Sequence, residues 1–554
     1  MSAKSDSWLA KIGPLVTTGE WEAAYVLMSR ADDAGEVASG EAFQQFAVCA
    51  YMTGREDTYV DLMMRAFDDF VAGASQQRAA RAAFWIGLTL MFRGEFGRGG
   101  GWLARADKLI EELGDECVEA GYVLLPQVEV YFGKGDNERA KQLASEALAI
   151  GKRFRDDDLA AIARHLVGRA RMILGDIEGG LSELDETMVA VIEGHLSPIV
   201  TGLVYCSVIE ACQKYQILRR ASEWTGALSS WCARQPELVA FTGRCLIHRS
   251  EILLFDGQWN VAEAEAGNAI TRLAQGPANH HAGPAYYQLG EVHRLRGDLD
   301  AADASFRSAS TLGFDPQPGL ALMRMRQGNL RSAGASIRRA LAAAANPVQR
   351  MRLLPAAFEI ALAAEDSVAS AAFCIEMETL AETYSSEVID ATSAEMRGDL
   401  SRAEGKIELA VQSYARAAAL WRDMQAPYRL CRVRMRTARA CADLGDTEGS
   451  MAEARAARDG FEKLGAEPDR EAAEAVLRQV ESGRSELLTP RQSQVLRFIA
   501  RGLKNREIGK RLGLSERTID RHVSDILTRI DVPTRSAAVA YALSKGFLEA
   551  SDFE

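Results

Sequence analysis

Residues 286–316 read YYQLGEVHRLRGDLDAADASFRSASTLGFDP, and this stretch contains the pattern that organises most of the 554-residue chain. Gly297 separates two runs rich in Ala, Leu, Arg and Asp, and neither run alternates with the period of two that marks a strand. Glycine adopts turn conformations without a steric penalty. The stretch therefore predicts two antiparallel helices joined at Gly297.

The same arrangement recurs along the chain at spacings that are mostly near 40 residues. Two larger gaps are near double that spacing, and they have degenerate members near Gln216 and Asp366. Twelve residues after each glycine the residue is Ala in nine of ten cases, and five residues after it is usually Ala or Gly. Small residues let neighbouring helices approach closely, so the pattern predicts stacked helix hairpins with a continuous core. The ten glycines are Gly19, Gly54, Gly94, Gly135, Gly175, Gly257, Gly297, Gly328, Gly405 and Gly445.

This repeated unit resembles a tetratricopeptide repeat. The resemblance is clearest at Leu289, Gly290, Gly297, Ala302, Phe306 and Ala309, with Tyr286 and Pro316 beside them. It implies an all-α fold in which residues 1–475 form a right-handed α-solenoid of about twelve helix pairs. Such arrays present a concave face, on which we expect a protein or a small effector to bind.

Composition and charge limit the classes of protein to which the chain can belong. It is 47% hydrophobic with 14 Pro, and no apolar run approaches the length of a membrane span. The N-terminus lacks a secretion signal, so we expect a cytoplasmic protein without a membrane partner. Nine scattered Cys contain no C-x2-C pair, which favours buried structural thiols over a disulfide framework or a metal site.

The charge is distributed unevenly along the chain. The net charge is −12, yet residues 489–545 contain twelve Lys and Arg against five Asp and Glu. This segment therefore carries +7 and the remainder −19. An acidic body with a basic end indicates that the basic end binds nucleic acid.

The basic segment predicts four short helices. Residues 487–543 read LLTPRQSQVLRFIARGLKNREIGKRLGLSERTIDRHVSDILTRIDVPTRSAAVAYAL. Thr489 to Gln492 form a capping box, the second helix spans about 505–512, and Ser515 can cap the third. The fourth begins near Arg535 and ends at Gly546. The preceding window, residues 476–488, contains a short polar stretch and is predicted to be a linker.

The third predicted helix has two contrasting faces. Ile519, Val523, Ile526 and Ile530 form one apolar stripe. The opposite face is polar and basic, and a three-residue turn separates this helix from the second. Both features match a helix-turn-helix, whose second helix lies in the major groove of DNA. The polar face comprises Arg517, Asp520, Arg521, Ser524 and Thr528.

This segment resembles the LuxR-type DNA-binding domain over about residues 487–545. The resemblance implies that residues 489–554 bind double-stranded DNA in a bacterial transcription regulator, with the fourth helix supporting a homodimer. It rests on Leu488, Thr489, Pro490, Arg491, Val495, Leu496, Gly502, Asn505, Glu507, Ile508, Leu512, Ser515, Thr518, His522, Ile526, Leu527 and Arg535. The candidate DNA contacts are Lys504, Asn505, Arg506, Lys510, Ser515, Arg517, Thr518, Asp520, Arg521, His522, Ser524, Thr528 and Arg529.

Two departures from the family pattern concern these contacts. Lys504 stands where the family usually has Ser, so Asn505 is a candidate cap of the second helix. Asp520 stands where the family often has Lys or Arg, and its carboxylate could accept from cytosine N4 or orient Arg521. Asp520 therefore leaves an alternative open, in which the array is a protein-binding scaffold and the terminal domain no longer binds DNA.

Other candidate sites are weaker. His280 and His281 are predicted to lie in an exposed turn rather than a metal site. The Gly94–Gly101 cluster lacks the order of a phosphate loop, so no nucleotide switch is expected. We expect no enzyme and no cofactor, because no nucleophile–base pair or metal cluster stands out.

Overall fold

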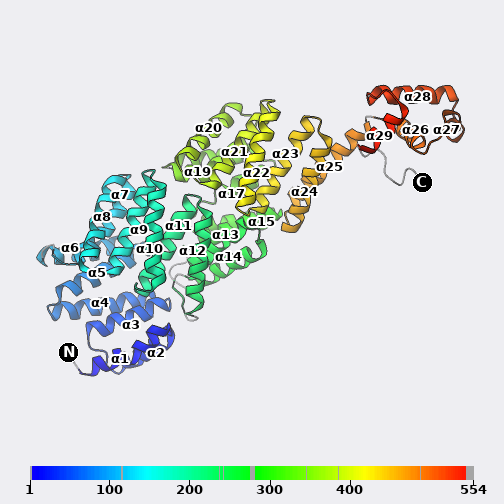
Figure 1. Cartoon of the computed structure of the whole chain (residues 1–554). Coiled ribbons are helices and arrows are strands. Elements are labelled where there is room, and N and C mark those ends of the chain that lie inside the picture. The colour runs from blue at the N-terminus through cyan, green and yellow to red at the C-terminus, as the bar shows by residue number, and fades with distance from the viewer. Residues whose placement is uncertain are drawn as a thin grey trace. The chain divides into compact units, whose positions relative to one another are not determined.

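The fold is described by a computed structural model. Within the described residues the model contains 29 α-helices and no strand (Figure 1), which confirms the all-α class. The chain forms two compact units, Met1–Ser393 and Ala394–Glu554. None of the described helices is both long and apolar enough to cross a membrane. The described residues are 3–113, 116–235, 238–240, 242–274, 281–344, 346–384, 386–486 and 488–544.

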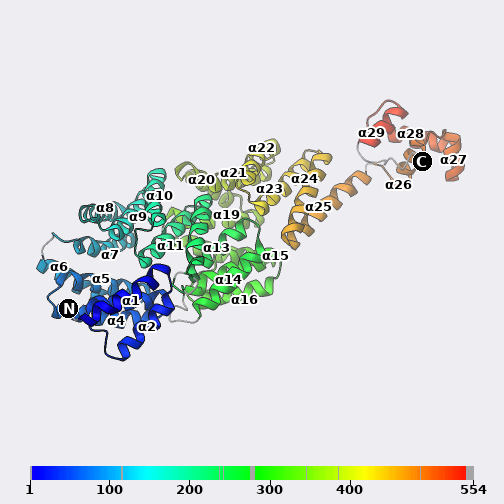
Figure 2. The same ribbon diagram turned by 60° about the horizontal axis from the view of Figure 1, so that its bottom comes forward.

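Helices α1 to α20 belong to the first unit, in which consecutive helices pack as neighbours (Figures 1 and 2). They are α1 Ala3–Thr18, α2 Trp21–Asp33, α3 Gly40–Met52, α4 Glu56–Ala72, α5 Gln76–Phe92, α6 Phe96–Leu113, α7 Glu119–Lys134, α8 Asn137–Phe154, α9 Asp157–Ile173, α10 Ile177–Glu193, α11 Pro198–Lys214, α12 Leu218–Ala233, α13 Thr242–Phe255, α14 Trp259–Leu273, α15 Gly283–Arg296, α16 Leu299–Thr311, α17 Gly319–Arg326, α18 Leu330–Ala343, α19 Pro347–Ala363 and α20 Ser367–Thr383.

The remaining helices continue the chain to its C-terminal domain. They are α21 Glu387–Ala403, α22 Ile407–Asp423, α23 Pro427–Asp443, α24 Thr447–Leu464, α25 Glu467–Glu486, α26 Pro490–Ala500, α27 Asn505–Leu512, α28 Glu516–Arg529 and α29 Arg535–Ser544.

A left-handed residue joins each odd-numbered helix from α1 to α23 to the next helix. All ten glycines of the sequence series have φ between 76° and 95°, as a tight helix–helix turn requires. In the two gaps of the series, Gln216 and Glu365 take the same place, each with φ of 58°. The predicted hairpin turns are confirmed, and the second degenerate member lies one residue before Asp366.

Aspartates beside several turns cap the helix that follows. Each side chain accepts a hydrogen bond from the backbone N–H three residues later, which satisfies an otherwise unpaired donor. The capping residues of this kind are Asp136, Asp176, Asp298, Asp366 and Asp446.

Small residues allow the close helix packing that the repeat predicts. The residue twelve positions after each of the ten glycines is buried in every case. A Cβ on Gly290 would lie 2.5 Å from Cε1 of the fully buried Phe306, so only glycine leaves room for that ring. Similarly, a Cβ on Gly180 would lie 2.7 Å from the carbonyl oxygen of Gly168. Helices α9 and α10 therefore touch backbone to backbone at this point.

Most of the cysteines lie in the core, as predicted. Seven are buried, and Cys232 and Cys441 are half-buried. Burial raises the pKa of the Cys49 thiol to about 12 and that of Cys206 to about 11, so both thiols stay protonated and apolar.

The window predicted to be a linker, residues 476–488, is helical as far as Glu486, where α25 ends. Its only strong helix breaker is Gly483, and one glycine in a helix costs only about 1 kcal/mol. Ion pairs also favour the helix, since Glu474 contacts Arg470 and lies 3.7 Å from Arg478. The polar residues that suggested a linker are therefore compatible with a continuous helix up to Glu486.

Candidate nucleic-acid interface

Helix α26 begins with the capping box that the sequence predicts. The backbone N–H of Gln492 donates to Thr489 Oγ1 at 3.2 Å, and the N–H of Thr489 donates to Gln492 Oε1 at 2.9 Å. Pro490 occupies the first helical position, where its missing N–H has no consequence. Val495 and Leu496 then point into the core shared by α26 to α29.

The turn between α27 and α28 is short and closely packed. Gly513 has φ of 66°, and the N–H of Thr518 donates to Ser515 Oγ at 3.1 Å to start α28. A Cβ on Gly509 would lie 2.7 Å from the carbonyl oxygen of Leu514, so α27 and the turn are in close contact. The predicted helix-turn-helix is confirmed.

Helix α28 turns its apolar stripe inward. Ile519 and Ile526 are fully buried and Ile530 is 5% exposed, while Val523 packs partly buried against the same core. These four positions recur at helical spacing, so the face opposite to them is directed to solvent. Core packing thereby fixes the orientation of the polar face.

Most of the candidate DNA contacts lie on the surface. Asn505, Thr518 and His522 are half-buried. The exposed candidates are Lys504, Arg506, Lys510, Ser515, Arg517, Asp520, Arg521, Ser524, Thr528 and Arg529.

Four exposed cations of this surface have no partner within the described part of the chain. Neither a hydrogen bond nor an ion pair engages Arg506 and Lys510 of α27, or Arg517 and Arg521 of α28. Helical geometry places Arg517 one turn before Arg521, so both lie on the outward face of α28. Their guanidinium groups are available to bases and phosphates.

Asp520 and Asn505 take part in a network inside the domain. Asn505 Nδ2 donates to Asp520 Oδ1 at 2.5 Å, and Arg535 Nη1 donates to Asn505 Oδ1 at 2.5 Å. Arg535 also donates to the carbonyl oxygen of Leu503, and burial lowers the pKa of its guanidinium. The network links α27, α28 and α29.

This network corrects two expectations. Asn505 does not cap α27, because Lys504 is the N-cap residue and its N–H donates to Glu507 Oε2 at 2.7 Å. A lysine side chain has no acceptor, so the other half of the capping box is missing. Asp520 does not orient Arg521, because its position on α28 directs it toward α27 and Asn505.

Arg529 and Arg491 also make contacts inside the domain. Arg529 Nη1 donates to Gln492 Oε1 at 3.3 Å, which links the end of α28 to the start of α26. Arg491 Nη2 donates to the carbonyl oxygen of Leu512 at 2.6 Å and so satisfies the C-terminus of α27. The family resemblance marked Arg491 without giving it this role.

Two family models match parts of the chain. The model described as bacterial regulatory proteins, luxR family, matches residues 486–542. A tetratricopeptide repeat model matches residues 283–312. The first match covers all of α26 to α28, and the second covers α15 and α16.

Two curated relatives share a short segment with the chain. The transcriptional regulatory protein DegU of Brevibacillus brevis is 33% identical over 90 residues, which is 16% of this chain and 38% of DegU. The response regulator protein VraR of Staphylococcus aureus is 36% identical over 64 residues, 12% of this chain and 31% of VraR. The chain thus spans less than two fifths of the length of these relatives.

Two solved structures are similar over a larger share of the chain. The APC/C hetero-tetramer Cut9–Hcn1 matches 87% of this chain and 96% of its own, with a TM-score of 0.37 and 13% identity. A Signal Transduction ATPase with Numerous Domains protein from Pyrococcus horikoshii, which has a tetratricopeptide repeat sensor, matches 52% of this chain and 43% of its own. Its TM-score is 0.32 at 16% identity.

Proposed function

We propose that this chain, whose C-terminal helices form a LuxR-type helix-turn-helix, is a DNA-binding transcription regulator. The DNA-binding domain comprises residues 489–554, and the array of residues 1–475 binds a protein or a small effector. The proposal rests mainly on α28, which buries Ile519 and Ile526 while Arg517 and Arg521 stay exposed and unpaired among the described residues. The regulators DegU and VraR support it through the segment they share with this chain.

The exposed face of α28 would read base edges in the major groove. Arg521 lies almost directly opposite the buried stripe, so it faces the floor of the groove, and Arg517 lies one turn nearer the helix N-terminus. An Arg side chain binds guanine O6 and N7 with two hydrogen bonds. Ser524 and Thr528 follow on the same face and offer hydroxyl groups to neighbouring base pairs.

Residues of α27 would hold the phosphate backbone. Lys504, Arg506 and Lys510 are exposed cations on or beside this helix. Contacts of this kind set the position of a protein on DNA without reading its sequence. The N-terminus of α28, with Ser515 and Thr518, adds backbone dipoles that favour a phosphate.

The remaining candidates have supporting roles in this proposal. Asn505 and Asp520 hold α28 against α27, and Arg529 divides its donors between Gln492 and the DNA backbone. His522 is half-buried, so it offers less surface to a phosphate than the exposed candidates do.

We also propose that the protein binds DNA as a homodimer. One short recognition helix reads few base pairs, so two half-sites are usual. In α29, Leu543 is 43% exposed, which leaves an apolar side chain for a second copy. Val539 and Tyr541 already pack partly against the domain core and would contribute less. A regulator of chromosomal genes would act in the bacterial cytoplasm.

The scaffold alternative, without DNA binding, rested on a carboxylate at position 520. That carboxylate accepts a hydrogen bond from Asn505, so part of its charge is satisfied inside the domain. The observation favours the DNA-binding proposal over the alternative.

Selection of bound fragments from sheared genomic DNA by the full-length chain tests the proposal. We expect a small set of fragments to be enriched, with an affinity that falls steeply as salt rises. Lys510→Ala should lower the salt slope by about 1, because it removes one phosphate contact. Arg416→Ala in α22, which removes another exposed cation, is the matched control and should leave the slope unchanged. Absence of any enriched fragment, or binding that ignores salt, would refute the proposal.

A further inference from the structure

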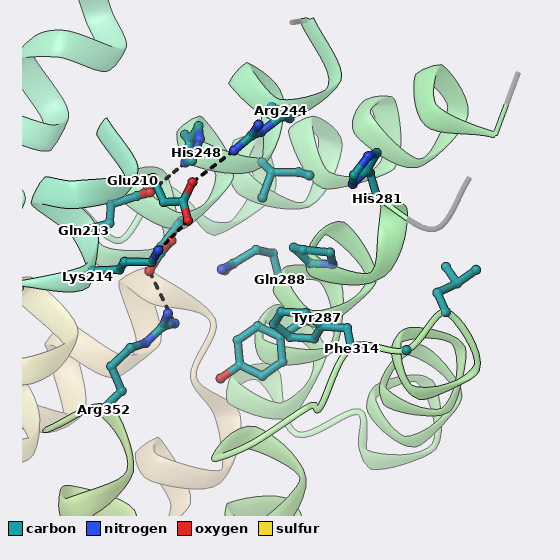
Figure 3. Close-up of a pocket in the computed structure, with 15 residues that line it drawn as sticks. Glu210, Gln213, Lys214, Arg244, His248, His281, Tyr287, Gln288, Phe314 and Arg352 are labelled. Atoms are coloured by element: carbon teal, nitrogen blue, oxygen red, sulfur yellow. Dashed lines mark hydrogen bonds and ion pairs between the residues drawn. The ribbon is translucent and has the colours of Figure 1, made fainter. Parts of the chain in front are cut away.

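A pocket of about 590 Å³ lies within the first unit. Helices α11, α13, α15 and α19 and the turn that follows α16 line it (Figure 3). Its volume falls in the range of small-molecule sites, roughly 300–1,000 Å³. The lining residues are Glu210, Gln213, Lys214, Arg244, Ile247, His248, Glu251, His281, Pro284, Tyr287, Gln288, Leu312, Gly313, Phe314 and Arg352.

His281 belongs to this pocket, which corrects the sequence-based expectation of an exposed turn. It is half-buried and precedes α15, whereas His280 lies outside the described residues. The sequence showed a Pro- and Gly-containing stretch, and it could not show that His281 lines a pocket together with residues of α13 and α15.

One buried side chain points into the pocket without a partner. Gln288 is only 5% exposed, and its amide makes no hydrogen bond to any residue that the structure describes. Figure 3 shows this amide directed at the space between Lys214, Tyr287 and Arg352. An amide offers both N–H donors and an acceptor oxygen, so Gln288 can hydrogen-bond a polar group of a ligand in the pocket.

Two further polar atoms of the lining are buried and unpaired. His248 Nδ1 lies 2.6 Å from Gln213 Oε1, while His248 Nε2 and Gln213 Nε2 have no partner in the described structure. The amide oxygen accepts only, so Nδ1 carries the proton and Nε2 is an acceptor. Burial lowers the pKa of His248 to about 4, which keeps the ring neutral at pH 7. Neither unpaired atom has appreciable exposed surface, so this pair shapes the wall of the pocket and does not contact a ligand directly.

The charged residues of the pocket leave a surplus of one positive charge. Glu210 pairs with Lys214 at 2.7 Å and with Arg244 at 3.0 Å. Burial opposes ionisation of Glu210, but the charges of Lys214 and Arg244 outweigh it and lower its pKa to about 2. Arg352 forms an ion pair with Glu251 at 3.7 Å and makes no hydrogen bond within the described residues. Its N–H donors therefore remain available to an anionic group.

An apolar surface completes the lining. The rings of Tyr287 and Phe314 lie 5.5 Å apart, centre to centre, and Ile247 and Leu312 lie beside the same space. Aromatic side chains of this kind pack against the apolar body of a ligand, while a few polar groups fix its orientation.

We infer that this pocket binds a small carboxylate that also carries an amide and a large apolar group. The carboxylate lies at Arg352, the amide bonds with Gln288, and the apolar group packs on Tyr287 and Phe314. Both an N-acyl amino acid and the C-terminus of a short peptide have this chemistry. The inference deepens the sensor part of the proposed function and names its ligand class.

Three related probes separate the recognised groups. N-acetylphenylalanine has all three features, N-acetylphenylalaninamide lacks the carboxylate, and 3-phenylpropionate lacks the amide. Calorimetric titration of the full-length chain should show saturable binding of N-acetylphenylalanine, about tenfold or more tighter than the other two, since each lacks a desolvated hydrogen-bonding group. The acetylated tripeptide Ala-Ala-Phe distinguishes the two kinds of natural ligand. Tighter binding than that of N-acetylphenylalanine indicates the C-terminus of a peptide, and equal or weaker binding indicates a small N-acyl amino acid.

Two variants assign the probe groups to side chains. Arg352→Gln should weaken binding of N-acetylphenylalanine until it equals that of N-acetylphenylalaninamide. Binding of N-acetylphenylalaninamide itself should not change. Gln288→Met, which keeps the side-chain volume, should weaken binding of N-acetylphenylalanine until it equals that of 3-phenylpropionate. Arg307→Gln removes an exposed cation of α16 that does not line the pocket, and it should change nothing. Circular dichroism of each variant checks that it is folded.

The inference is overturned if wild-type protein binds none of the probes at millimolar concentration, or binds the acid and its amide equally. It is also overturned if folded Arg352→Gln and Gln288→Met proteins bind as wild type does. These titrations contain no DNA. A failure here therefore leaves the DNA-binding proposal standing, and a failure to enrich genomic fragments leaves this result unaffected.

Discussion

Replacing Asn505 by Ala should loosen the C-terminal domain, because one side chain links three of its helices. The substitution removes the hydrogen bonds with Asp520 of α28 and Arg535 of α29. Hydrogen bonds to charged groups contribute roughly 1.5–3 kcal/mol each when buried. Asn505 is half-buried and Asp520 exposed, so the two bonds together should contribute about 2 kcal/mol after screening by solvent.

Hydrogen exchange in the full-length chain measures this change locally. A loss of about 2 kcal/mol corresponds to roughly thirtyfold less protection of the amides of α26 to α29. The amides of the array should not change. DNA affinity should fall as well, because the Asp520 carboxylate loses its partner and α28 loses a contact with α27.

Asp525→Ala is the matched control for this measurement. Asp525 is an exposed carboxylate of α28, the helix that contains Asp520, and has no partner among the described residues. Its removal should therefore alter protection by less than about 0.5 kcal/mol. If Asn505→Ala lowers protection no more than Asp525→Ala does, the network does not stabilise the domain and the reasoning is refuted.

Three further predictions concern the array and the dimer. Burial lowers the pKa of His165 to about 3 and that of His248 to about 4, from an ordinary 6.5, so below pH 6.5 the unfolded chain binds protons that the folded chain does not. The unfolding free energy of the array, measured in urea, should fall between pH 6.5 and pH 4 by up to about 1.4 kcal/mol per unit per histidine, and a flat profile would contradict this. Gly180→Leu should destabilise the array by about 3 kcal/mol or more because it forces α9 and α10 apart, whereas Gly133→Leu, where a Cβ meets open space, should be neutral or stabilising; equal melting temperatures would exclude the close contact. Leu543→Asp should weaken dimer formation on DNA without unfolding the domain, and an unchanged two-half-site footprint would remove Leu543 from the interface.

Features set by neighbouring residues were predictable from the sequence. A glycine in the turn and an alanine twelve residues later are both visible in one repeat, so the hairpins and their buried faces followed directly. The spacing also located the turn without glycine at Gln216, and it placed the second one at Asp366, one residue after Glu365. The stripe from Ile519 to Ile530 likewise fixed the outward face of α28.

Features that join distant residues were not predictable from the pattern. Asn505 and Asp520 lie 15 positions apart, and Asn505 and Arg535 lie 30 apart, so their network depends on how three helices pack. The pocket joins Glu210 to Arg352, which belong to different repeats. Helix α25 continues through a polar stretch because ion pairs and helix propensity outweigh one glycine. The domain bounds at 475 and 489 stay a prediction.

Binding of Arg521→Ala to an enriched genomic fragment and to random duplex DNA, at one fixed salt concentration, tests the central claim most directly. Arg521 is exposed and makes no hydrogen bond or ion pair in the described structure, so the variant should fold as wild type does. Loss of a bidentate contact to guanine should reduce the ratio of specific to random affinity by about 5- to 150-fold, or roughly 1–3 kcal/mol. An unchanged ratio would show that Arg521 does not read bases and would contradict the assignment of this face of α28 to the DNA groove.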